Sequence, residues 1–169
     1  PLLFLNAAFA AQEPALVSGM VAQLARQVAN QNNPDSARAL VVALAAQPAA
    51  ADALTATALQ SLTANLKPVV KPVADAALGS ALKRLLASDQ TAGAVLPLIG
   101  RWDFADQVGD AAKSAVSKAE VRLADKSLSD DERGQIAANL LGVRSLDPSI
   151  VPAVAALVGS DASSGLQRR

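Results

Sequence analysis

Short helix-breaking segments divide this sequence into many stretches of similar length, and each stretch carries apolar residues at helical spacing. Breaks such as "QNNPDSA" and "KPVVKPV" contain asparagine or proline, which favour turns, and proline also disfavours helix in the residue before it. Between two such breaks, Leu16, Met20, Leu24 and Val28 recur every fourth residue, as they do along one face of a helix. The pattern therefore predicts many short helices.

The amino-acid composition also favours helices and argues against a sheet. Alanine occurs 39 times and leucine 24 times among the 169 residues, and both lose little side-chain freedom in a helix. Aromatic residues make up only 2% of the chain, so paired strands would have few cross-strand contacts to stabilise them. We expect an all-α fold. Because alanine buries little area, the core requires close approach between many helices rather than a few helices around one large centre.

Eight or nine helices, mostly of two to four turns, are expected. Besides a first helix near the N-terminus, the predicted segments are residues 14–30, 36–47, 51–66, 73–88, 92–100, 103–125, 127–142 and 147–160. The apolar spacing predicts these buried residues: Leu16, Met20, Leu24 and Val28 with Val17 and Val21 beside them; Leu40, Val41 and Leu44; Leu54, Ala58, Leu62 and Leu66; Val73, Ala77, Leu82, Leu85 and Leu86; Phe104, Val108, Ala112, Ala115, Ala119 and Leu123; Ile136, Leu140 and Leu141. Expected N-caps are Asp35 or Ser36, Asp52, Ser129 or Asp130, and Asp147; Asp103 and Asp106 are expected in a first turn, and Gly142 at a C-terminal end.

The N-terminal stretch "LLFLNAAFAAQE" allows two interpretations. Its apolar run followed by Ala-Phe-Ala is similar to a signal-peptide cleavage region, whereas Leu2, Leu5 and Phe9 fall near one face of a helix. We favour a buried first helix, because the sequence opens on Pro1 and no basic region precedes the apolar run. No stretch approaches the ~18 uninterrupted apolar residues that a membrane-spanning helix requires.

Two arrangements of these helices compete, a compact bundle and a stacked array of helical hairpins. One hairpin is expected to start at Asp130 and the next at Asp161, a spacing of 31 residues, close to the period of two-helix repeats. Similar hairpins span residues 14–47 and 52–87, and "SDASSGLQRR" restates "SDDERGQIAA" as the start of a further unit. We therefore expect a right-handed α-α superhelix (a HEAT- or armadillo-like solenoid) over residues 1–169, as one segment of a longer array.

Two long stretches carry a resemblance to a known family. "DERGQIAANLLGVRSLDPSIVPAVAALVGSDASSGLQRR" resembles HEAT-type helical repeats, close in character to the repeat region of large bacterial membrane-bound dehydrogenases, and "GMVAQLARQVANQNNPDSARALVVALA" also fits such a region. The motifs are apolar spacings together with Arg133, Gly142 and Asp147. The resemblance implies a β-propeller before the helical array, a c-type haem domain after it, and an extracytoplasmic (periplasmic) location. No Cys-x-x-Cys-His occurs here, so no haem and no catalytic residue carries over to this segment.

The charge balance bears on the partners of the chain. Fifteen basic and fifteen acidic residues give a net charge of zero, which speaks against a nucleic-acid binder. The charges are uneven, with 11 in residues 1–100 and 19 in residues 101–169. The first part is poor in solvating groups for an exposed surface, so we expect another part of the parent protein to cover it.

No residue pattern predicts catalysis, a metal site or a cofactor. The sequence has no cysteine and no histidine, and the serines Ser80, Ser114 and Ser117 lie near Lys83, Lys113 and Lys118 in the manner of a solvated helix surface. The acids Asp130, Asp131 and Glu132 lack the spacing and glycine of a calcium loop and suit the first turn of a helix. "GSDASSG" has neither the lysine nor the preceding strand of a phosphate-binding loop, so a cap and a turn explain it.

Arg101-Trp102 is the remaining candidate for a partner contact, since both residue types are enriched at interface hot spots. We favour the alternative in which Trp102 fills the core and Arg101 lies at the surface. The leading hypothesis is a non-catalytic scaffold or protein-interaction module. The alternatives are an accessory domain of a dehydrogenase or cytochrome-type enzyme, an enzyme acting through carboxylates or lysine in a groove, and an amphipathic protein that opens on lipid surfaces.

Overall fold

The computed structural model describes residues 14–144 and 149–159, and within these ranges the chain is all-helical and contains no strand. The all-α prediction is confirmed for this part of the chain. The helices are α2 (Pro14–Asn30), α3 (Pro34–Ala45), α4 (Asp52–Asn65), α5 (Ala76–Ala87), α6 (Asp89–Trp102), α7 (Ala105–Ala124), α8 (Asp130–Leu141) and α9 (Ile150–Gly159), with a short 3₁₀ turn, η2 (Ala49–Ala51). Three predictions lie outside the described residues: the helix around Leu2, Leu5 and Phe9, the cap Asp147, and the segment from Asp161.

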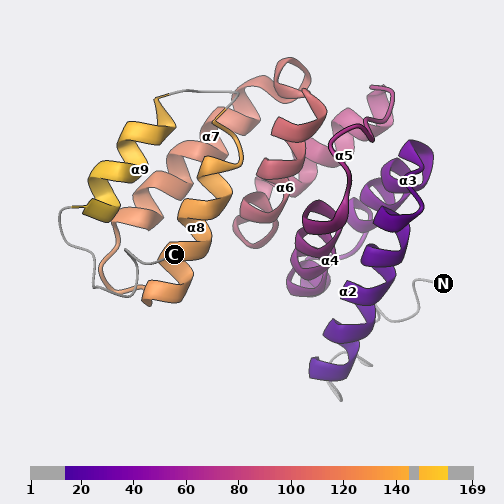
Figure 1. The fold of residues 1–169 in the computed structure, drawn as a ribbon, viewed down its shortest axis with the longest axis horizontal. Coiled ribbons are helices and arrows are strands. Elements are labelled where there is room, and N and C mark those ends of the chain that lie inside the picture. The colour runs from indigo at the N-terminus through magenta and orange to yellow at the C-terminus, as the bar shows by residue number, and fades with distance from the viewer. Residues whose placement is uncertain (1–13, 145–148, 160–169) are drawn as a thin grey trace.

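The helices form two rows. In one row α2 packs on α4, α4 on α6 and α6 on α8; in the other, α3 packs on α5, α5 on α7 and α7 on α9 (Figure 1). Among the described helices, no pair more than two positions apart in the chain packs extensively. The helices of the first row, α2, α4, α6 and α8, begin at Pro14, Asp52, Asp89 and Asp130, so their starts are 38, 37 and 41 residues apart. Each described helix therefore packs on helices one or two positions away in the chain.

Side-chain hydrogen bonds between distant residues repeat the same spacing. Within the described ranges, every such bond that joins residues more than ten positions apart spans between 29 and 39 residues. The Ser61 hydroxyl, for example, donates to the Ala22 carbonyl at 2.7 Å, and the Arg84 guanidinium donates to the Gln47 carbonyl at 3.1 Å. These two bonds connect one helical pair to the next pair in the chain, whereas the Lys118–Asp89 bond joins α7 to α6.

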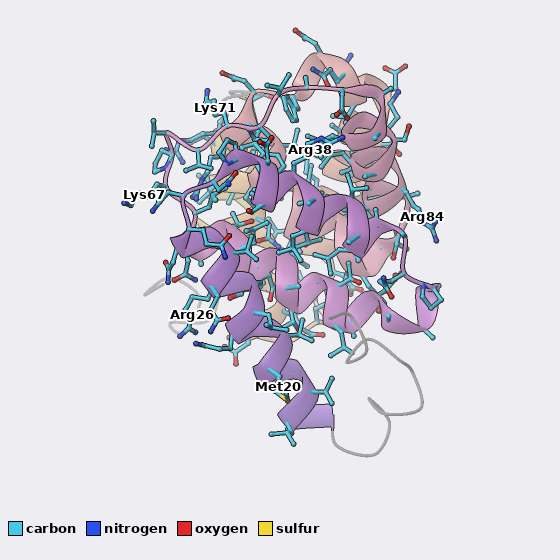
Figure 2. The ribbon with its side chains drawn as sticks, turned by 90° about the vertical axis from the view of Figure 1, so that its right-hand side faces the viewer. Met20, Arg26, Arg38, Lys67, Lys71 and Arg84 are labelled. Atoms are coloured by element: carbon cyan, nitrogen blue, oxygen red, sulfur yellow. The ribbon has the colours of Figure 1, made fainter. Side chains whose placement is uncertain are left out.

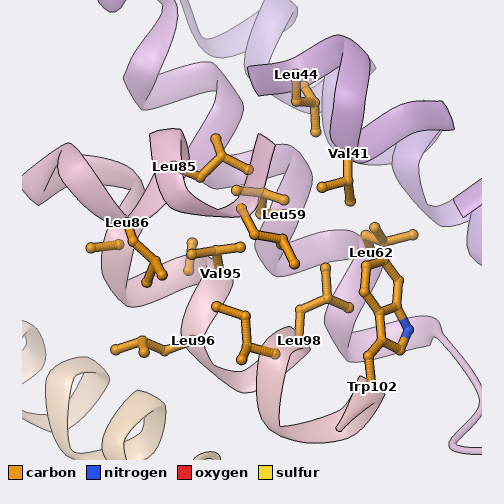
Figure 3. Packing of buried hydrophobic residues seen from close by; sticks show 14 of the residues in the cluster. Val41, Leu44, Leu59, Leu62, Leu85, Leu86, Val95, Leu96, Leu98 and Trp102 are labelled. Carbon is orange, nitrogen blue, oxygen red and sulfur yellow. The ribbon is translucent and has the colours of Figure 1, made fainter. Parts of the chain in front are cut away.

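The buried apolar residues form one continuous cluster from α2 to α9. Alanines fill much of it, while leucine, isoleucine and tryptophan supply the largest fully buried side chains, such as Leu59, Leu62, Leu98 and Trp102. Figure 3 shows that these large side chains pack between α3, α4, α5 and α6. Because alanine contributes few contacts of its own, dispersion energy here depends on close helix–helix approach.

The predicted buried face of α2 is wrong for Leu16 and Leu24 and is confirmed for Val17 and Val21. Leu16 is 57% exposed and Leu24 is 39% exposed, whereas Val17, Val21, Ala25 and Ala29 are buried. Two apolar stripes run side by side along this helix, and the one with smaller side chains faces α4. This choice lets the two helices approach closely enough for the Ser61–Ala22 hydrogen bond. Figure 2 views this end of the molecule, where α2 also presents Met20 and Arg26.

Predictions for the other buried faces are largely confirmed, with three exceptions. Leu44, Leu62, Leu82 and the α7 residues Phe104, Val108, Ala112, Ala115 and Leu123 are buried as predicted. Val73 is 80% exposed and Ala77 is exposed, because α5 begins at Ala76, where the Asp75 carboxylate accepts a hydrogen bond from the Leu78 N–H. Leu141, in the last turn of α8, is 36% exposed.

Helix ends were predicted less well than helix faces. The N-cap of α3 is Asn33, whose side chain accepts from the Asp35 and Ser36 N–H groups, so neither Asp35 nor Ser36 is the cap. Asp52 is the first residue of α4 and is not its cap; its carboxylate accepts a hydrogen bond from Ser88. Ser129 caps α8 and Gly142 ends it, as predicted.

Two helices differ in extent or shape from the prediction. The helix α6 begins at Asp89, includes Pro97 and continues through Trp102, so the predicted segment 92–100 is too short. Asp103 adopts a left-handed conformation at the end of α6 and does not lie in the first turn of α7, whereas Asp106 does. The predicted long helix is interrupted at Gly109, where φ is 39° and ψ is −115°.

Two glycine substitutions test the packing of the rows. An alanine Cβ at Gly142 would lie 2.8 Å from the Pro97 Cβ on α6, a contact too short to form without a shift of α8. We expect Gly142→Ala to lower the free energy of unfolding by about 1–3 kcal/mol. Gly79→Ala, inside α5 with open space around its Cβ, should raise it by about 0.5–1 kcal/mol. Urea denaturation measures both, and equal stability of the two variants would contradict this packing.

Candidate functional site

Arg101 and Trp102 hold two segments together and do not form an exposed contact site. Trp102 is 2% exposed, its indole N–H donates to the Val70 carbonyl at 3.1 Å, and its ring meets Phe104 edge-on. The prediction that Trp102 fills the core is confirmed. The prediction for Arg101 is wrong: its Nη1 donates to the carbonyls of Thr63 and Leu66, both at 2.6 Å, which satisfies acceptors at the end of α4.

The serines and lysines considered for nucleophilic chemistry lie on the outside of α5 and α7. Ser80, Ser114 and Ser117 are exposed, as are Lys83, Lys113 and Lys118. Within the described ranges, none of these serines hydrogen-bonds to a lysine. Lys113 pairs with Asp110 at 4.0 Å, and Lys118 pairs with Asp89 at 3.2 Å. The structure therefore does not bring these groups together.

The acidic cluster starts α8. Ser129 and Glu132 form a capping box, in which the Ser129 hydroxyl accepts from the Glu132 N–H and the Glu132 carboxylate accepts from the Ser129 N–H and hydroxyl. These hydrogen bonds from Ser129 lower the pKa of Glu132 below its ordinary value of 4.5. In residues 14–144 and 149–159 no group of three or more acidic side chains is placed to hold a metal ion. The "GSDASSG" stretch, from Gly159, lies almost wholly outside these ranges.

A cavity of about 190 Å³ lies between α6, α7 and α8. The cavity is lined by Asp89, Ala92 and Gly93 of α6, by Ala115, Lys118, Ala119 and Arg122 of α7, and by Glu132, Gln135, Ile136 and Asn139 of α8. Small apolar side chains supply most of its surface, and the charged groups stand among them. We take this cavity as the candidate site, because three successive helices converge on it.

The helices α6 and α8 approach each other closely beside the cavity. Gly142 lies against Pro97, and the Asn139 amide lies 3.0 Å from the position that a Cβ on Gly93 would occupy. Gly93 and Asn139 themselves belong to the lining of the cavity. The α7 residues that lie beneath are alanines, which are too small to fill the space.

The polar groups of the cavity differ in how they are held. Asp89 pairs with Lys118, and Glu132 accepts from Ser129. Gln135 Nε2 donates to Asn139 Oδ1 at 3.1 Å, so the two amides form a pair one helical turn apart. Arg122 is exposed and has no carboxylate within ion-pair distance among the described residues.

A second hollow of about 230 Å³ lies between the α3–η2 connection and the end of α5. Its polar groups are bonded to one another: Arg84 donates to the Gln47 carbonyl at 3.1 Å, and the Ser88 hydroxyl donates to Asp52 at 2.5 Å. These bonds span 37 and 36 residues, so they join successive helical pairs. We assign this hollow to the packing of the helices and not to a ligand.

Comparisons with known proteins give no relative for this chain: no family model, curated protein or solved structure matches it. The resemblance to the dehydrogenase repeat region therefore stays a prediction from the sequence. In the described part of the chain, no helix has the length and apolar character needed to cross a membrane.

Reasoning from the sequence missed four polar residues of the cavity, Asp89, Arg122, Gln135 and Asn139. A signal was present, because Lys118 and Arg122 are four residues apart on one helix, as are Gln135 and Asn139 on the next. This spacing places each pair on one face. It does not reveal that the two faces lie against the same cavity.

Arg101 is expected to stabilise the fold through the carbonyls that it binds. Arg101→Met should lower the free energy of unfolding by about 1–3 kcal/mol, because buried acceptors at the end of α4 lose charged donors. Arg26→Met on the exposed face of α2 is the matched control and should change stability by less than about 0.5 kcal/mol. Urea denaturation measures both variants, and a neutral Arg101→Met would show that the two hydrogen bonds do not stabilise α4.

The pKa shifts predict loss of stability in acid. Ser127 lowers the pKa of Asp125, and the Leu78 N–H, with Arg38, lowers that of Asp75, both below the ordinary value of 3.8. Since these pKa values and that of Glu132 are lower in the folded than in the unfolded chain, their stabilisation is complete above about pH 4.5 and disappears as the pH falls through the folded-state values.

Glu132→Gln tests this pH dependence, because the amide oxygen still accepts a hydrogen bond but does not titrate. We expect the variant to lose less stability than the wild type between neutral pH and about pH 3. Urea denaturation at a series of pH values gives the comparison. Parallel curves for the two proteins would mean that the Glu132 carboxylate does not contribute to the acid transition.

Proposed function

We propose that this chain is a non-catalytic, HEAT- or armadillo-like α-solenoid with a right-handed superhelical path, and that it binds a protein partner. The repeat of side-chain hydrogen bonds at spacings of 29 to 39 residues carries this proposal. Two rows of helices, each helix packed on its nearest neighbours, also support it. A layered array has an extended surface on which several successive helices present side chains together.

The cavity between α6, α7 and α8 is the proposed contact point. It combines a small apolar floor with charged and amide groups around it, which is the usual character of a site for one anchoring side chain. Its volume is somewhat above the ~150 Å³ of an apolar cavity that holds benzene, so one aliphatic or aromatic side chain fits. Protein recognition accounts for these features without any reactive group.

Truncation tests the layered architecture. A chain ending at Ala124 lacks α8 and α9, yet leaves α2 to α5 with all their partners. We expect it to retain its helical content per residue and a cooperative, less stable unfolding transition, as layered arrays do. Circular dichroism measures both. Deletion of α4 is the matched control and should abolish folding, because α4 packs on both α2 and α6.

If the chain ending at Ala124 is a random coil while the full chain folds, the helices share one cooperative core and the solenoid proposal is wrong.

A peptide selection tests the binding function. A library of random decapeptides with free C-termini is selected on the full chain, and enriched sequences are then tested on two variants. Ala119→Phe places a large side chain in the cavity and should abolish binding, whereas Ser114→Phe, exposed on the same helix outside the cavity, should retain it. Circular dichroism checks that both variants fold. Failure to enrich any peptide that distinguishes the two variants would contradict protein binding at this cavity.

A further inference from the structure

We infer that the cavity between α6, α7 and α8 captures the C-terminal residue of a partner chain, with an aliphatic side chain on the alanine floor and the terminal carboxylate on Arg122. This inference rests on the proposed protein-binding function and specifies its ligand. Three independent features of the cavity point to this chemistry.

The first feature is that Arg122 forms no ion pair with a described carboxylate. The other cation of the cavity, Lys118, is paired with Asp89 at 3.2 Å. The positive charge of Arg122 helps to lower the pKa of Glu132 and of Asp125, while these carboxylates accept hydrogen bonds from Ser129 and Ser127. The guanidinium, with no carboxylate in ion-pair distance among the described residues, thus presents its donors to an incoming anion. A planar guanidinium matches the two oxygens of a carboxylate.

The second feature is the amide pair on α8. Gln135 uses one N–H to donate to Asn139 Oδ1. In this arrangement the Gln135 carbonyl oxygen and the Asn139 amino group keep one acceptor and one donor for a ligand. A peptide group offers the complementary donor and acceptor. The pair therefore suits the last peptide bond of a chain, which a simple fatty acid lacks.

The third feature is the apolar floor of the cavity. Ala92, Ala115 and Ala119 line it together with Ile136, and none of these carries a polar side-chain group. The volume of about 190 Å³ accepts a leucine or isoleucine side chain, whose burial releases water from an apolar surface. A charged or strongly polar side chain would lose its hydration there without a partner. The floor therefore favours an apolar last residue, and leucine or isoleucine fits its volume.

Fluorescence anisotropy tests this inference on the full chain. The probe is a fluorescein-labelled pentapeptide that ends in leucine with a free carboxylate, and its matched partner is the same peptide with a C-terminal amide. We expect the amide to bind at least about tenfold more weakly to the wild type. Arg122→Gln should weaken binding of the free-acid peptide by a similar factor. The free-acid and amide peptides should then bind this variant with equal affinity. Arg26→Gln, on the exposed face of α2, should behave as the wild type.

Other outcomes overturn the inference in separate ways. Equal binding of acid and amide peptides would eliminate the carboxylate contact, and retention of the difference in Arg122→Gln would eliminate Arg122. Hexanoate and the unlabelled free-acid peptide are also compared as competitors of the labelled peptide. If hexanoate displaces the labelled peptide at the same concentrations, the cavity is a site for small aliphatic acids. If library peptides bind the cavity equally well as C-terminal amides, the protein-binding function stands and the C-terminal inference fails. If neither the leucine peptides nor any library peptide binds, both fail.

Discussion

Close approach of neighbouring helices within a row is the constraint on which this structure depends. An alanine-rich chain has few large side chains with which to stabilise itself, so its helices have to approach one another closely to gain dispersion energy. The helix α2 illustrates the consequence: it buries Val17, Val21, Ala25 and Ala29 and leaves Leu16 largely exposed. Only at this short separation can the Ser61 hydroxyl reach the Ala22 carbonyl of the neighbouring helix.

Hydrogen bonds between successive helical pairs supply the orientation that alanine contacts lack. Dispersion between small side chains has little directionality, so one helix could slide along another at low cost. Donors on one pair that reach carbonyls of the previous pair fix the register, as Arg101 does for Thr63 and Leu66, and as Trp102 does for Val70. The larger side chains of this chain therefore serve alignment as well as burial.

The sequence was informative wherever structure is determined within one segment. Apolar periodicity correctly predicted the buried face of α7 and the burial of Leu44 and Leu62, because a 3.6-residue repeat depends only on local geometry. On α2 it failed for Leu16 and Leu24, because two stripes were available and the neighbouring helix decided between them. It also failed for Arg101, whose partners lie 35 and 38 residues away. The cavity was beyond reach for the same reason, because its lining comes from three separate helices.

The position of the cavity follows from the same physics as the core. Between α6 and α8, Gly142 lies against Pro97 and the Asn139 amide lies close to Gly93, and the α7 alanines that line the cavity, Ala115 and Ala119, are too short to fill it. The space falls in the part of the chain that is rich in charge, so Lys118, Arg122 and the α8 amides stand around an apolar floor. A packing defect and a charged surface coincide here, so apolar and polar groups lie together in one site.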